Sequence, residues 1–68
     1  MRHSKQLRQT EMIELVETHN IALSIRRIKN QSGGYDGDRW KRAVYHALSL
    51  CYVGRAQIEK IRVALELP

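Results

Sequence analysis

The sequence predicts an all-α fold of three to four short helices in a small bundle, and three observations lead to this prediction. Apolar residues recur at helical spacing on both sides of one interruption. That interruption, residues 32–38, holds three glycines and two aspartates, which favour turns over helix or strand interiors. At 68 residues, the chain has room for one domain with a small core. Residues 1–68 are therefore expected to form a single helical domain, and the pattern allows a dimer.

The chain begins with a basic stretch, residues 1–9, that is poor in apolar side chains. Its cations are Arg2, Lys5 and Arg8. Leu7 is its one sizeable apolar residue beyond the initiator methionine. Because so little of this stretch can be buried in a core, we expect a flexible basic arm.

Two helices are expected between this arm and the interruption. Thr10 can cap the first, because its hydroxyl can accept a hydrogen bond from an exposed backbone N–H group. On one continuous helical wheel, the apolar residues of the two halves point in nearly opposite directions. The phase changes at His19-Asn20, and Asn tolerates the left-handed conformation that ends helices. Helices over about 10–18 and 21–30 account for both halves, and one long helix buried on two sides is the alternative.

A third helix is expected after the interruption. Its apolar residues recur at intervals of four, three and four residues: Trp40, Val44, Ala47 and Cys51. This spacing predicts an amphipathic helix whose buried stripe includes the Cys51 thiol. Asp38 is expected to cap its beginning, and Gly54 is expected to end it.

A last helix is expected over about 55–67. One apolar face carries Ile58, Ile61 and Leu65, which we assign to the core. Val63 and Leu67 lie on nearly the opposite side of the wheel. A second apolar stripe in so small a protein favours contact with another subunit, so the pattern predicts a homodimer through Val63 and Leu67.

Charge and cysteine usage indicate the class of partner and the compartment. The net charge is +5, the sequence pI is about 9.9, and a positive field raises the rate of encounter with polyanions. Cys51 is the only cysteine, which excludes a disulfide within the chain. No run approaches the roughly 18 apolar residues of a membrane span, and no signal-peptide segment follows the start. We therefore expect a cytoplasmic protein without a membrane partner.

The strongest candidate for a binding site is a basic cluster on both sides of the glycine-containing stretch. Its cations end one helix and begin the next. At the beginning of a helix, exposed N–H groups already concentrate positive potential. Phosphate recognition uses such a combination of cations, helix start and small residues, and a tyrosine on the loop can stack on a base. The candidate site residues are Arg26, Arg27, Lys29, Tyr35, Arg39, Lys41 and Arg42.

Two simpler interpretations compete with this site. The cations that end the second helix complement the negative end of its dipole, and Asp36 and Asp38 can neutralise those that begin the third. A helix-turn-helix over residues 12–29 has the right gross shape, with Asn20 in place of the turn glycine. It would, however, place His19 and Arg26 at positions that such a unit buries.

No catalytic, metal or cofactor site is expected. Asp36-Gly37-Asp38 resembles the start of a calcium loop, but no acidic residue stands near the twelfth position. The glycines belong to no phosphate-binding loop of the Gly-Lys-Ser/Thr type. The three histidines have no metal-binding spacing, and no nucleophile has a neighbouring base.

The sequence thus favours a small basic nucleic-acid-binding protein, a phosphate-contacting regulator of the type found on mobile elements or phages. Its partner would be DNA or RNA. The alternative is a small inhibitor or adaptor that docks a basic and aromatic face on an acidic surface of a larger protein complex. Neither function requires a cofactor.

Overall fold

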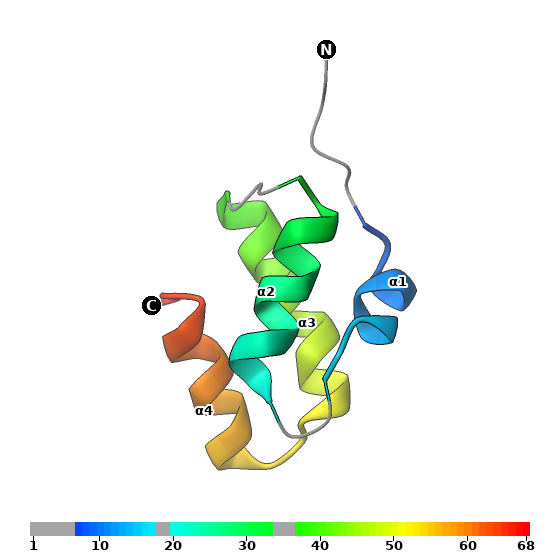
Figure 1. Cartoon of the computed structure of the whole chain (residues 1–68). Coiled ribbons are helices and arrows are strands. Elements are labelled where there is room, and N and C mark those ends of the chain that lie inside the picture. Colours follow the sequence, from blue (N-terminus) through cyan, green and yellow to red (C-terminus); the bar gives the residue numbers. More distant parts are fainter. Residues whose placement is uncertain (1–6, 18–19, 34–36) are drawn as a thin grey trace.

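The computed structural model describes residues 7–17, 20–33 and 37–68, and these residues form an all-α bundle (Figure 1). Its helices are α1 (Gln9–Glu14), α2 (Ile21–Gln31), α3 (Asp38–Cys51) and α4 (Arg55–Ala64). The predicted fold class is therefore confirmed. Residues 1–6 of the predicted arm and the loop tyrosine Tyr35 lie outside the described residues. Of the remaining arm residues, Leu7 packs against the core and Gln9 begins α1.

α3 is the central helix of the bundle. It packs against α1 and α4, and α4 also packs against α2. Figure 1 shows α2 running in front of α3, with α1 and α4 on either side of the pair. All four helices and the residues that follow α3 and α4 contribute to the core, whose buried members are Met12, Ile28, Trp40, Val44, Ala47, Leu48, Tyr52, Ile61 and Leu65.

The predicted break between the first two helices is confirmed, but the roles of the residues around it differ. α1 is preceded by Arg8, whose backbone N–H donates to the Glu11 carboxylate over 2.7 Å, and Thr10 lies inside the helix. Asn20 begins α2 instead of ending α1. Its backbone is extended, with φ −136°, and its side chain accepts a hydrogen bond from the Leu23 N–H over 2.9 Å. The change in direction of the apolar face near Asn20 therefore marks the start of α2 rather than the end of α1.

The ends of α3 also differ from the prediction. Asp38 is its first residue rather than its cap, which is Gly37. The Cys51 side chain is exposed, whereas Tyr52 is buried. Cys51 is the last residue of α3, and the extended backbone of Tyr52 places the Tyr52 side chain in the core instead. Gly54 then precedes α4 as its cap, with an ordinary φ of −70°.

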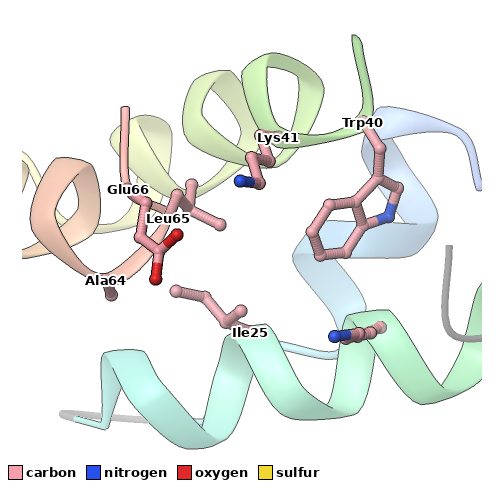
Figure 2. A pocket seen from close by; sticks show the side chains of 7 residues that line it. Ile25, Trp40, Lys41, Ala64, Leu65 and Glu66 are labelled. Atoms are coloured by element: carbon pink, nitrogen blue, oxygen red, sulfur yellow. The ribbon is translucent and has the colours of Figure 1, made fainter. Parts of the chain in front are cut away.

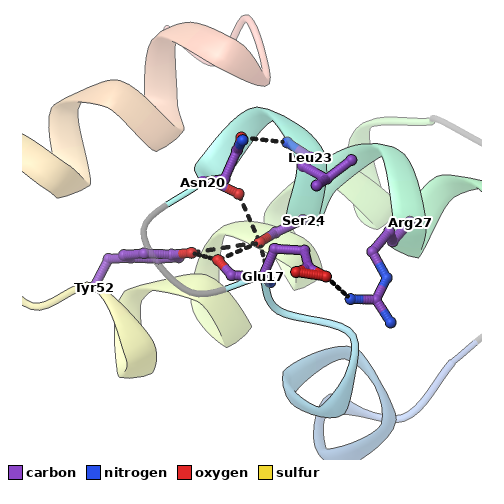
Figure 3. A network of polar contacts seen from close by, with 6 residues as sticks. All are labelled: Glu17, Asn20, Leu23, Ser24, Arg27 and Tyr52. Carbon is purple, nitrogen blue, oxygen red and sulfur yellow. Dashed lines mark hydrogen bonds and ion pairs between the residues drawn. The ribbon is translucent and has the colours of Figure 1, made fainter.

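Two buried serines, Ser24 within α2 and Ser32 at its C-terminal cap, hold this helix against the α3 segment. Ser32 accepts a hydrogen bond of 3.3 Å from the Trp40 indole N–H, and Figure 2 shows this indole turned toward α2. At the other end of the helix pair, the Ser24 hydroxyl lies 3.4 Å from the Tyr52 hydroxyl (Figure 3). Because the C-terminal end of α2 meets the start of α3 and its N-terminal end meets the residue after α3, the two helices run antiparallel.

The Tyr52 hydroxyl also binds the connection between α1 and α2. It donates to the Glu17 backbone carbonyl over 2.5 Å. The Glu17 N–H in turn donates to the Ser24 hydroxyl over 2.7 Å, and that hydroxyl donates to the Asn20 carbonyl over 2.9 Å (Figure 3). Buried polar groups thus satisfy one another at the point where α1, α2 and α3 meet.

The chain reverses direction after α4. Among the described residues, Glu66 is the one non-glycine with positive φ, 57°. Its N–H donates to the Val63 carbonyl and the next N–H donates to the Arg62 carbonyl, both over 3.0 Å, which is the Schellman arrangement of a helix end. Leu67 is thereby turned back to pack against the core, while Val63 is 66% exposed. The two residues assigned to a homodimer thus differ in exposure, and the dimer stays a prediction.

We predict that Tyr52→Phe lowers the free energy of unfolding by about 1–2 kcal/mol, because the Glu17 carbonyl loses its short hydrogen bond inside the protein. The thermal midpoint should then fall by about 4–8 °C for each kcal/mol. Tyr45→Phe is the matched control, since the Tyr45 hydroxyl makes no hydrogen bond within the described residues. Equal midpoints for the two variants would contradict the assigned role of Tyr52.

We predict that Glu66→Gly stabilises the fold by about 1 kcal/mol, because glycine adopts the left-handed conformation without a Cβ clash. Glu66→Ala removes the same carboxylate but keeps the unfavourable φ, so it should bring no gain. Urea unfolding followed by circular dichroism measures both. A glycine variant no more stable than the alanine variant would show that φ at this position costs nothing.

Candidate functional site

The outward face of α3 carries a short basic row. Arg39, Arg42 and His46 are exposed and lie at intervals of three and four residues, so they share one side of the helix. The row rises about 10 Å along the helix axis. Within the described part of the chain, no carboxylate forms an ion pair with Arg39 or Arg42. Their charges are therefore available to a ligand.

A hollow of about 200 Å³ adjoins this row between α3 and the end of α4. It is lined by Arg42, Tyr45, His46, Arg62, Leu67 and Pro68. The rings of Tyr45 and His46 meet edge to face, with centroids 5.7 Å apart and planes at 70°. The hollow thus combines cations, aromatic rings and an apolar portion.

Arg62 is fixed on its wall of this hollow by bonds in two directions. Its Nη2 donates to the Glu59 carboxylate oxygens over 3.1 and 3.3 Å, and its Nη1 donates to the Pro68 carbonyl over 3.0 Å. Both terminal nitrogens are therefore engaged. Because a guanidinium donates within its own plane, these bonds leave its flat faces for stacking.

A second hollow, of about 160 Å³, brings Lys29 and Lys41 together. Ile25, Trp40, Leu65 and Glu66 also line it. Figure 2 shows Lys41 and Trp40 of α3 on one side of this space, Ile25 of α2 opposite them, and the Glu66 carboxylate near the end of α4. This space is cationic but also holds an acid, so its field is weaker than that of the α3 row.

The remaining predicted cations lie elsewhere. Arg27 forms an ion pair with Glu17 over 2.5 Å, with both side chains about 40% exposed (Figure 3). Arg26 is exposed on the side of α2 opposite buried Ile28, whereas Arg39 and Arg42 lie opposite the buried stripe of α3. Since these buried faces meet in one core, Arg26 and the α3 row lie on opposite sides of the bundle.

The structure thus divides the seven predicted site residues. It brings Arg39 with Arg42 and Lys29 with Lys41. Arg27 pairs with Glu17 instead, and Arg26 lies one helical turn before Lys29 on α2, away from Arg39 and Arg42. Consecutive residues of a helix point about 100° apart, which is why Lys41 does not share the helix face of Arg39 and Arg42. Tyr35, the predicted stacking residue, lies outside the described residues.

The seven predicted site residues leave out three residues of the α3–α4 hollow: Tyr45, His46 and Arg62. The helical wheel places Tyr45 and His46 on the polar side of α3 with Arg42, which was the available signal. Arg62 belongs to another helix, and its approach depends on how α4 packs. The helix-turn-helix interpretation of residues 12–29 gains no support, because the short α1 packs against α3.

The described ranges provide no residues for a metal site or a membrane-spanning helix. No three His, Cys, Asp or Glu side chains there gather in a way that suits a metal ion. None of the helices so described has the length and apolar character needed to cross a membrane. In comparisons with known proteins, no family model, curated protein or solved structure matches the chain.

Proposed function

We propose that this protein binds nucleic acid, through phosphate contacts made by the outward face of α3. The observation that carries the proposal is the exposure of Arg39 and Arg42 in the first turns of α3, without a carboxylate partner in the described chain. Cations near a helix start are unfavourable by a few tenths of a kcal/mol to about 1 kcal/mol. A bound phosphate removes this repulsion, because it is attracted to both the guanidinium groups and the helix dipole.

The overall charge favours the same class of ligand. A net charge of +5 on 68 residues attracts polyanions before any specific contact forms. Phosphates recur along a nucleic-acid strand, so a row of cations on one helix face can meet more than one of them. Arginine suits this role because its donors match phosphate oxygens in a fork.

A second candidate function is docking on an acidic protein surface, and exposed apolar residues favour it. Leu50 is 61% exposed and Val53 is 76% exposed, both near the turn between α3 and α4. Protein interfaces bury apolar residues of this kind within a polar rim. A stoichiometric protein recovered with the chain from nuclease-treated lysate, together with no oligonucleotide binding, would favour this function over nucleic-acid binding.

We predict that Arg39→Glu/Arg42→Glu weakens oligonucleotide binding at least tenfold, because two phosphate contacts are lost and two repulsions are added. Fluorescence anisotropy with labelled DNA and RNA, single-stranded and duplex, measures the effect. Wild-type affinity should fall about tenfold or more between 50 and 200 mM salt, and the variant should show a shallower salt slope.

Arg26→Glu/Lys60→Glu is the matched control, because it makes the same charge change at two exposed positions outside the α3 row. It should lose much less affinity than the α3 variant. An equal loss in both would show that net charge, rather than the α3 face, governs binding. Absence of wild-type binding at 50 mM salt would refute the proposed function. Circular dichroism confirms that each variant keeps its helices.

A further inference from the structure

We infer that the hollow between α3 and α4 takes one unpaired nucleobase, so that the ligand of this protein is single-stranded. The inference rests on the proposed function and names the form of nucleic acid that it selects. The hollow shares Arg42 and His46 with the basic row of α3. A strand whose phosphates lie along that row therefore has this hollow beside its bases.

The lining of the hollow suits a flat aromatic ring. Tyr45 and His46 supply two rings, and their edge-to-face contact uses at most one face of one ring. Arg62 presents a guanidinium plane whose terminal nitrogens are already bonded to Glu59 and Pro68. Unpaired bases stack on both kinds of surface, tyrosine or histidine rings and arginine planes.

The hollow is a small depression of the surface. Its volume of about 200 Å³ is below the ~300 Å³ at which pockets for drug-sized molecules begin. One planar ring system fits such a space better than a whole nucleotide. A base within a duplex is stacked on both faces and paired along one edge, so only an unpaired base can enter.

The test compares oligonucleotides that differ only in their bases. One probe is a labelled eight-nucleotide oligo-dT, and the other has the same phosphates but abasic sugars. Wild-type protein should bind oligo-dT about tenfold more tightly, as expected for one stacked base. An oligo-U probe shows whether RNA shares the preference, and a hairpin duplex should bind no better than the abasic strand.

Two variants of Tyr45 assign the preference to the hollow. Tyr45→Leu keeps an apolar side chain against the core but lacks a ring, so it should bind the two probes equally. Tyr45→Phe keeps the ring and should retain the tenfold preference. His46→Ala, at an exposed position, should also reduce the preference for oligo-dT. This variant replaces Tyr45→Leu as the test if Tyr45→Leu fails to fold.

Equal wild-type affinity for oligo-dT and the abasic strand would overturn the base subsite. If Arg39→Glu/Arg42→Glu still weakened binding, the phosphate surface of α3 would stand. A tenfold preference that survives both Tyr45→Leu and His46→Ala would likewise overturn the base subsite, since the base would then stack elsewhere. Absence of binding to every probe at low salt would overturn the inference together with the proposed function.

Discussion

The polar contacts of Ser24 and Ser32 with the aromatic residues of the α3 segment determine how the bundle is assembled. Ser32 meets Trp40 at one end of the helix pair, and Ser24 meets Tyr52 at the other. The Ser32 and Ser24 hydroxyls also donate to the carbonyls four residues earlier in the chain, over 2.8 and 2.9 Å respectively. Sliding either helix by one turn would leave buried polar groups without partners, at about 1–3 kcal/mol each. The core is too small to absorb such a loss, so one register is selected.

That register also decides which residues reach the solvent. With Trp40 and Tyr52 held against α2, the stripe that includes Val44 and Ala47 faces the core, and Arg39 and Arg42 face outward. α4 packs beside α3 and brings Arg62 to the same side. The cationic row and the adjoining hollow are thus consequences of core packing, although none of their cations is buried.

Sequence reasoning predicted the regular parts of the fold and failed where the chain leaves a helix. The break before α2 and the buried stripe of α3 follow from periodicity, which is a local property. Leu67 was misplaced because the wheel continues the helical rotation past Glu66, where the backbone becomes left-handed. Cys51 was misplaced because the wheel does not show that Tyr52, extended after the end of α3, fills the core at that point. In the candidate site, the outward position of Arg39 and Arg42 follows from α3 alone. The meeting of Tyr45 with Arg62 depends on packing between helices, which spacing within one segment does not encode.

The buried and the exposed sides of α3 have different roles, and this difference affects how the chain can evolve. Its buried side fixes the fold through residues such as Val44, while its exposed side carries Arg39 and Arg42. Exposed substitutions usually change stability by less than about 0.5 kcal/mol. Descendants of this gene can therefore acquire new ligand preferences by changing outward residues of one helix, while inheriting the same scaffold.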